Sequence, residues 1–225
     1  MKRSEINSVI KKMEALIQEN GFCVPPFCGW TPEDWNEKGT ECSEIRDNML
    51  GWDVTDYGGG DFSALGLALI TIRNGNQKLP QYTKTYAEKL LMSEEDQISP
   101  MHFHWNKMED IINRGGGHLA MQLYNSNPDE SFADTDVEYS ADGVRKVVPS
   151  GSVIVLLPGE SITLPPGLYH KFWGVKGHGP VLIGEVSQTN DDNTDNRFYE
   201  SLPRFTRVEE DAAPYRLLCN EYPQA

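Results

Sequence analysis

Residues 102–109 read HFHWNKME, a segment in which one aromatic residue separates two histidines and a glutamate follows five positions after the second. In a β-strand, side chains two positions apart point to the same side, so the imidazoles of His102 and His104 are expected to lie together. Glu109 follows a bend and can bring its carboxylate to the same point from the next strand. The segment therefore predicts two strands that meet at a cluster of metal-binding side chains.

A second segment supplies a further side chain of this kind. Residues 159–170 read GESITLPPGLYH, in which a Pro-Pro-Gly turn brings His170 onto a new strand. Three neutral imidazoles and one carboxylate suit a divalent first-row metal and favour Mn, Fe, Co, Ni or Zn over Ca or Mg. We therefore predict a metal site made of His102, His104, Glu109 and His170.

The sequence around these segments predicts an all-β protein. Short apolar or alternating runs begin at Asp56 and are separated by Gly, Pro and Asn, and the pair at 74–75, Asn-Gly, is a strong turn signal. About ten strands at this spacing are typical of an antiparallel sandwich or barrel. No βαβ alternation, GxGxxG motif or P-loop is present. The predicted strands are 65–72, 86–92, 100–105, 110–113, 118–124, 145–148, 152–157, 161–164, 169–175 and 180–187.

The first residues predict helices instead. Apolar residues recur at three- and four-residue spacing from Ile6 to Ile17, which is the pattern of one buried helix face. Ser4 is the expected N-cap of this helix, and Gly21 lies where a left-handed C-terminal cap is expected. A second, short helix is predicted to begin at the Thr-Pro pair 31–32.

These patterns divide the chain into three parts. Residues 1–55 form the predicted N-terminal helical extension packed on the barrel, residues 56–190 form the barrel, and residues 191–225 form a polar tail interrupted by prolines. This tail is predicted to wrap around the barrel or around a partner subunit.

Composition and charge exclude several kinds of partner. The chain has 225 residues, with 20 basic and 34 acidic side chains and a formal net charge of −14. A nucleic-acid-binding surface needs a basic stripe, and anionic membranes attract basic segments, so neither partner is expected. No apolar run reaches the ~18 residues that a membrane-spanning helix needs.

The four cysteines indicate a reducing compartment. Cys23, Cys28, Cys42 and Cys219 lack the paired C-x2-C spacing of a structural zinc site, and the first residues lack the apolar core of a secretory signal. Without export, disulfides are not expected. The cysteines are therefore predicted to be free thiols in a cytoplasmic protein.

The two histidine segments resemble the two conserved motifs of the cupin superfamily. The matching positions are His102, His104, Glu109 and Gly116 for HxH-x4-E-x6-G, and Gly159, Pro165, Gly167 and His170 for G-x5-P-x-G-x2-H. Two departures, Asp96 in place of a leading Gly and Gly174 in place of a frequent Asn, affect no ligand position. The resemblance implies a jelly-roll-like antiparallel β barrel with the metal ligands predicted above.

Longer stretches are similar to the bacterial D-lyxose isomerases of the cupin type. The similarity includes residues 102–113 (HFHWNKMEDIIN), the turn before His170, residues 184–198 (GEVSQTNDDNTDNRF), the chain length and the helical extension. It implies an aldose–ketose isomerase that converts free D-lyxose to D-xylulose, and D-mannose to D-fructose, through a cis-enediol. Mn²⁺ is the expected metal, with Fe, Co, Ni or Zn as alternatives.

Such an isomerase moves a proton between C1 and C2 and needs a base beside the metal. Glu185 is the candidate base, because it lies in an apolar strand where a carboxylate is costly unless it is paired or functional. Lys89 lies in a similar strand and is a candidate to protonate a sugar oxygen or open the sugar ring. Lys107, Asp192 and Arg197 are candidates to bind the sugar hydroxyls.

Several alternatives remain open. Glu185 could instead be a strand glutamate in a salt bridge, and Lys89 and Lys107 could be solvent-exposed lysines. Asp192 and Arg197 could belong to a solvent-exposed loop with no catalytic role. A cupin phosphosugar isomerase, an Fe(II) cupin dioxygenase and a non-catalytic sugar-binding cupin compete with the isomerase of free sugars. A phosphosugar enzyme needs an Arg or Lys clamp, and few basic residues lie in the motifs, so an uncharged sugar is favoured. A homodimer is expected, because cupins commonly pair through barrel edges.

Overall fold

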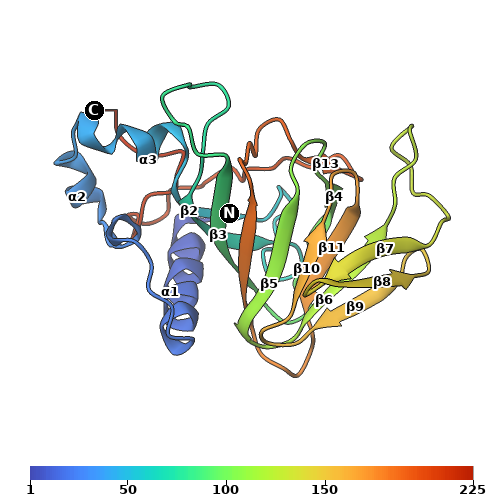
Figure 1. Cartoon of the computed structure of the whole chain (residues 1–225). Helices are drawn as coiled ribbons and strands as arrows, with labels where there is room; N and C mark the ends of the chain where they lie inside the picture. Colours follow the sequence, from blue (N-terminus) through green and yellow to red (C-terminus); the bar gives the residue numbers. More distant parts are fainter. Residues whose placement is uncertain (225) are drawn as a thin grey trace.

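The computed structural model describes residues 1–224, in which two antiparallel β-sheets form a barrel and short helices cover one side of it (Figure 1). The large sheet has the strand order β1-β2-β3-β12-β5-β10-β7-β8, and the small sheet has the order β13-β4-β11-β6-β9. The strands are β1 (Gly51–Thr55), β2 (Leu67–Arg73), β3 (Tyr86–Ser93), β4 (Ser99–Phe103), β5 (Glu109–Gly116), β6 (Leu119–Tyr124), β7 (Val137–Ala141), β8 (Val144–Val148), β9 (Val153–Leu156), β10 (Ser161–Leu164), β11 (Tyr169–Gly174), β12 (Val181–Gln188) and β13 (Arg197–Phe198). The helices are α1 (Arg3–Glu19), α2 (Pro32–Asn36) and α3 (Ser43–Asp47).

The predicted all-β barrel with an N-terminal helical extension is confirmed. Each of the ten predicted segments contains a strand, namely β2 to β6 and β8 to β12. Three strands were not predicted: β1, β7 and β13. Strand β1 lies in the segment assigned to the helical extension, yet it pairs with β2, with Trp52 opposite Ile70.

Two apolar cores explain why some strands lack an alternating pattern. One core fills the space between the sheets and includes Leu69 of β2 and Ile183 of β12. The other lies between α1 and the outer face of the large sheet, and includes Ile70 of β2 and Leu182 of β12. Both faces of these strands are buried, so the side chains on both faces are apolar. Each large apolar side chain that is fully buried contributes about 1.5–3 kcal/mol of burial free energy.

Helix α1 starts differently from the prediction. It begins at Arg3 after Lys2, with no side-chain cap, so the predicted cap at Ser4 is wrong. Instead, the hydroxyl of Ser4 donates a hydrogen bond to Asp211, 2.7 Å away in the C-terminal tail. The left-handed residue after the helix is Gly21, with a φ of 66°, as predicted.

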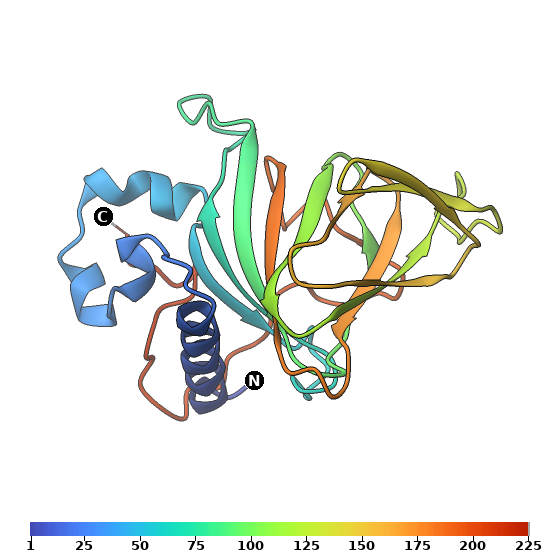
Figure 2. The same ribbon diagram turned by 60° about the horizontal axis from the view of Figure 1, so that its bottom comes forward.

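The C-terminal tail runs back along the helical side of the molecule (Figure 2). The guanidinium of Arg3 forms ion pairs with Glu210 and Glu221 of the tail. The ring of Tyr222 stacks on Trp35, with ring centroids 3.8 Å apart. The tail therefore ties the helices to the barrel within one chain. None of the helices in residues 1–224 is long and apolar enough to cross a membrane.

Candidate active site

Three histidines come together on the small sheet. Strands β4 and β11 are neighbours, and their register places His102 opposite His170, while His104 lies one residue beyond the end of β4. One ring nitrogen from each histidine lies within 4.8 Å of the others. The alternation predicted from the HFH segment thus brings both imidazoles to the same side of the strand end.

Backbone carbonyls orient all three rings. The Nδ1 atoms of His102, His104 and His170 lie 2.9, 2.7 and 3.1 Å from the carbonyl oxygens of residues 100, 195 and 168. A carbonyl only accepts, so each Nδ1 carries the proton and each Nε2 keeps a free lone pair. Burial and the two neighbouring imidazoles also hold the pKa of His102 well below its usual value. These neutral nitrogen donors fit a divalent first-row metal.

Glu109 completes the predicted ligand set. It is the first residue of β5, and its Oε1 lies 3.5 Å from Nε2 of His104 and 3.2 Å from Nε2 of His170. Its other oxygen lies 2.7 Å from Nζ of Lys107. Burial opposes ionisation of Glu109, but the charge of Lys107 outweighs it and holds the pKa of Glu109 well below its usual value. An ionised carboxylate therefore faces the three imidazoles.

Lys107 joins this carboxylate to the candidate base. Its Nζ lies 2.7 Å from Oε1 of Glu185 as well as 2.7 Å from Glu109. Although burial lowers the pKa of Lys107, the carboxylates of Glu109, Glu185 and Asp192 raise it above its usual value. Lysines in hairpins usually lie at the surface, but Lys107 is only 3% exposed.

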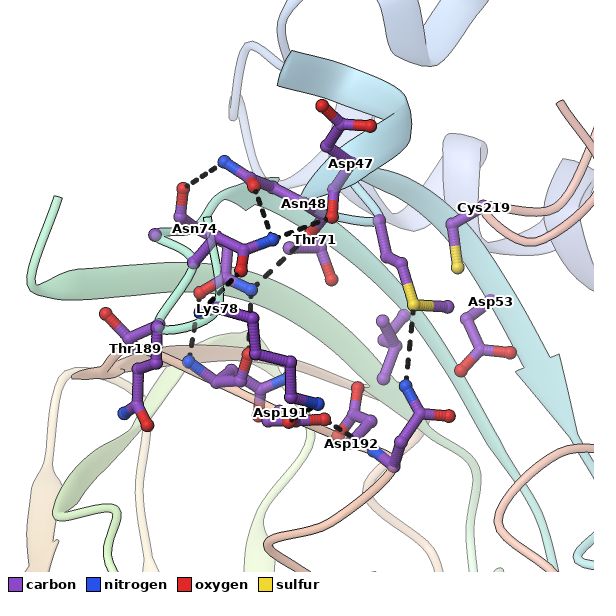
Figure 3. A pocket seen from close by; sticks show the side chains of 17 residues that line it. Asp47, Asn48, Asp53, Thr71, Asn74, Lys78, Thr189, Asp191, Asp192 and Cys219 are labelled. Atoms are coloured by element: carbon purple, nitrogen blue, oxygen red, sulfur yellow. Dashed lines mark hydrogen bonds and ion pairs between the residues drawn. The ribbon is translucent and has the colours of Figure 1, made fainter. Parts of the chain in front are cut away.

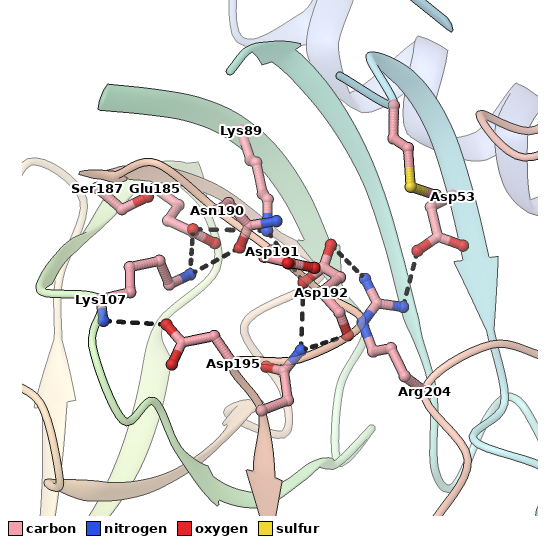
Figure 4. A network of polar contacts seen from close by, with 12 residues as sticks. Asp53, Lys89, Lys107, Glu185, Ser187, Asn190, Asp191, Asp192, Asp195 and Arg204 are labelled. Atoms are coloured by element: carbon pink, nitrogen blue, oxygen red, sulfur yellow. Dashed lines mark hydrogen bonds and ion pairs between the residues drawn. The ribbon is translucent and has the colours of Figure 1, made fainter. Parts of the chain in front are cut away.

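The alternation of charges continues beyond Glu185 (Figure 4). Nζ of Lys89 lies 3.6 Å from Glu185 and 3.5 Å from Asp192. Asp192 lies 3.2 Å from Arg204, whose other terminal nitrogen lies 2.7 Å from Asp53 of β1. We call this set the ion row, and its members are Glu109, Lys107, Glu185, Lys89, Asp192, Arg204 and Asp53.

Four of the five predicted catalytic and substrate-binding residues, Glu185, Lys89, Lys107 and Asp192, lie in the ion row. The exception is Arg197, whose Nε pairs with Glu130 at the surface end of β13. The arginine that contacts Asp192 is Arg204, which the sequence analysis missed. It lies in a tail with no periodic pattern, so no local signal could have distinguished it from other charged tail residues.

A cavity between the two sheets contains both the histidine cluster and most of the ion row. The residues that line it are Tyr57, Leu67, Leu69, Lys89, Leu91, Ser99, His102, His104, Lys107, Glu109, Ile111, His170, Phe172, Glu185, Asp192, Asn196, Phe198 and Arg204. Apolar side chains form one part of the wall, and the metal-binding and charged groups form the other. This division suits a small polar molecule held over a reactive centre.

A second cavity lies beside the first and has a different chemistry (Figure 3). Amide and carboxylate side chains dominate its wall, among them Asn48, Asn74 and Asp191. Asp192 lines both cavities. Most of the amides hold loops together, as when Asn74 donates to the carbonyl of Asn190 at 2.9 Å. This second cavity contains none of the histidine ligands.

Loss of Arg204 is expected to destabilise the fold. Replacing Arg204 with Met leaves Asp53 without its partner, and removing one member of a buried pair costs about 3–5 kcal/mol of unfolding free energy. Urea unfolding of the metal-free protein measures this loss. The matched control is Arg145→Met, because the Arg145–Glu138 pair is 72% and 56% exposed and solvent screens it, so its loss is expected to change the unfolding free energy far less. Equal losses in the two variants would contradict the prediction.

A sequence-family profile described as D-lyxose isomerase matches residues 1–222. The D-lyxose/D-mannose isomerase of Escherichia coli O157:H7 is 47% identical over 225 residues, which are 100% of this chain and 99% of that protein. The chain belongs to the D-lyxose isomerase family. The D-lyxose/D-mannose isomerase of Serratia proteamaculans is similar as well, with 46% identity over 99% of this chain and 98% of its own. The expectation of an aldose–ketose isomerase is thereby confirmed.

Solved structures of two sugar isomerases have the same fold as this member of the D-lyxose isomerase family. L-ribose isomerase of Cellulomonas parahominis, solved with L-ribose, superimposes with a TM-score of 0.61 and 15% identity over 93% of this chain and 98% of that chain. L-ribose isomerase of Acinetobacter sp. DL28 superimposes with a TM-score of 0.59 and 13% identity over 89% and 93% of the two chains. At these identities the likeness establishes the barrel architecture.

Proposed function

We propose that this enzyme interconverts free D-lyxose and D-xylulose, and also D-mannose and D-fructose, through a cis-enediol. The observation that carries the proposal is the Glu185 carboxylate, which one lysine joins to the histidine-lined centre in a member of the D-lyxose isomerase family. The similarity to the enzymes of Escherichia coli O157:H7 and Serratia proteamaculans supports the choice of sugars.

The metal site of the proposal consists of His102, His104, Glu109 and His170. One ring nitrogen of each histidine lies within 4.8 Å of the others, and Oε1 of Glu109 lies 3.5 and 3.2 Å from Nε2 of His104 and His170. The chemistry of this donor set suits Mn²⁺, Fe, Co, Ni or Zn. We propose Mn²⁺ as the native ion. When bound, a divalent ion supplies Lewis-acid stabilisation of the negative charge that develops on the sugar oxygens. Reconstitution of chelator-treated protein with each ion, followed by comparison of kcat, tests this choice.

Glu185 is the proposed base, which takes the proton from C2 of the aldose and returns it to C1. Lys107 and Lys89 both contact Oε1, which leaves Oε2 for the substrate. A general base needs such an available oxygen within hydrogen-bond reach of the proton that it takes. Lys107 therefore positions Glu185 while it neutralises Glu109.

Lys89 and Asp192 are the proposed contacts for the sugar hydroxyls. Both line the cavity, and Nζ of Lys89 lies between Glu185 and Asp192. At this position the ammonium can donate to a sugar oxygen as charge moves onto it, and it can also assist ring opening. Arg197 does not line this cavity, so we transfer its proposed role to Arg204, which does.

The charges around the cavity favour an uncharged sugar. Each of its three cations, Lys89, Lys107 and Arg204, already forms an ion pair with a carboxylate. A phosphate needs cations that are available for charge-assisted hydrogen bonds. A phosphorylated sugar would therefore have to break pairs of the ion row, which makes the phosphosugar isomerase the weaker candidate.

The test is an NMR experiment with Mn-loaded protein in D2O, using D-lyxose, D-mannose and fructose 6-phosphate. Proton transfer through a cis-enediol predicts ketose with solvent deuterium at C1. Formation of ketose without deuterium would contradict a proton transfer in which the proton on Glu185 exchanges with solvent. Turnover of fructose 6-phosphate without conversion of either free sugar would overturn the choice of substrate.

We also propose that the enzyme is a cytoplasmic homodimer. Exposed aliphatic side chains on the edge strands β8 and β9, including Val144, Val147, Val153 and Val155, support pairing through the barrel edges. The four cysteines, all free within the described residues, suit a reducing compartment. Light scattering measures the mass in solution, and cell fractionation measures the location.

A further inference from the structure

Asp195 links two parts of the site that are far apart in the sequence. Its carboxylate is buried and accepts three hydrogen bonds from the turn between β4 and β5. Oδ1 accepts from the backbone N–H of Asn106 at 2.9 Å and from its side-chain amide at 3.1 Å, and Oδ2 accepts from the backbone N–H of Lys107 at 3.0 Å. Figure 4 shows Asp195 facing Lys107. The side chain therefore clamps the turn that follows His104.

The backbone of the same residue orients a proposed metal ligand. The carbonyl oxygen of Asp195 accepts the Nδ1–H of His104 at 2.7 Å. The other two histidines use carbonyls that lie only two residues before them in the sequence. His104 is thus the one histidine of the three whose orientation depends on a distant segment.

That segment also covers the cavity. Residues 190–196 include Asp192 and Asn196, which line the cavity wall. The tips of its turn, Asn193 and Thr194, are exposed, whereas Asp192 pairs with Lys89 and Arg204. Asp195 differs from these contacts because its backbone and its side chain both bond to the strand end and turn that carry His104.

We propose that Asp195 is a positioning residue that couples metal affinity to the ordered placement of residues 190–196 over the cavity. This inference rests on the proposed metal site. When the carboxylate holds the turn, the carbonyl of Asp195 fixes the ring of His104 with Nε2 directed at the metal. Partners that orient a metal-binding histidine typically change metal affinity by about 10–100-fold when they are removed. The coupling is reciprocal, so metal binding also orders the segment.

The first test is Mn²⁺ affinity of Asp195→Asn, measured by electron paramagnetic resonance of free Mn²⁺. An amide has one accepting oxygen, so one N–H of the turn loses its partner, and the Kd for Mn²⁺ is expected to rise about 10–100-fold. The matched control is Asp61→Asn, because the Asp61 carboxylate also accepts three hydrogen bonds from a turn but lies outside the cavity and outside residues 190–196. Its Kd is expected to stay as in the wild type.

The outcomes distinguish this inference from the metal site itself. Tight Mn²⁺ binding by the wild type and equal binding by Asp195→Asn would overturn the inference alone. Failure of the wild type to bind Mn²⁺ at all would instead overturn the proposed site.

A second measurement needs no variant. Hydrogen–deuterium exchange of the wild-type protein is expected to show slower exchange in residues 190–196 when Mn²⁺ is added, and unchanged exchange there would contradict the coupling. In Asp195→Asn this response to Mn²⁺ is expected to be reduced. A purely structural role of Asp195 would lower Tm while leaving both the Mn²⁺ Kd and the exchange response as in the wild type.

Discussion

Replacing Glu185 with Gln is expected to lower kcat by about 10²–10⁴-fold, the usual contribution of a positioned general base. The amide has nearly the shape of the carboxylate and can still accept a hydrogen bond from Lys107. It cannot take the proton from the sugar carbon. The metal content is therefore expected to stay as in the wild type, because Glu185 is not a proposed ligand, and urea unfolding separates any loss of stability from the loss of proton transfer.

Steady-state kinetics with D-lyxose, together with metal analysis, checks this expectation. The matched control is Glu138→Gln on β7, an exposed glutamate outside the cavity, which is expected to leave kcat unchanged. A near-normal kcat in Glu185→Gln would assign the base to another residue. Asp192 is then the next candidate, because it is the other carboxylate next to Lys89.

Replacing Glu109 with Ala, or His102 with Ala, is expected to remove the metal and reduce turnover to background. Each change deletes one of four donors, and the Glu109 variant also leaves the ammonium of Lys107 facing the remaining imidazoles. A positive charge at that place opposes binding of a second cation. The affinity for the metal is therefore expected to fall further in Glu109→Ala than in His102→Ala, although each variant lacks one donor.

Elemental analysis after dialysis measures the metal per chain. The control is His118→Ala, because His118 stacks on His178, with ring centroids 3.8 Å apart, and is not part of the three-histidine cluster. It is expected to keep a full complement of metal. Wild-type stoichiometry in Glu109→Ala or His102→Ala would refute the ligand assignment.

The fold and the three-histidine cluster are predictable because their signals are local. Strand positions follow from short apolar runs, and His102 and His104 share a face because of their two-residue spacing. His170 follows a turn that only a few sequences encode. Each of these inferences uses fewer than about a dozen neighbouring residues, which is the range over which periodicity is informative.

The rest of the site depends on contacts between distant segments. Arg204 lines the cavity only because the tail folds back over the barrel, and its contacts with Asp53 and Asp192 join segments far apart in the sequence. Arg197, in the same segment as Asp192, pairs with Glu130 and does not line the cavity, which its neighbours in the sequence do not indicate either. Strand β1 was missed although residues 52–55, Trp-Asp-Val-Thr, alternate between apolar and polar, because the strand pattern was expected to begin only at Asp56.

The ion row has a consequence for how this enzyme can change by mutation. Its members alternate in sign, so the loss of any inner member leaves two like charges as neighbours in a largely dehydrated space. Neighbouring residues of this kind have strongly non-additive effects. A single replacement in the ion row therefore lowers the free energy of unfolding toward the minimum that function needs. A second replacement that restores the alternation of charges is expected to recover the lost stability. Substrate range at Lys89, Asp192 and Arg204 is expected to evolve through paired exchanges, and libraries that vary these positions one at a time will sample mainly unstable variants.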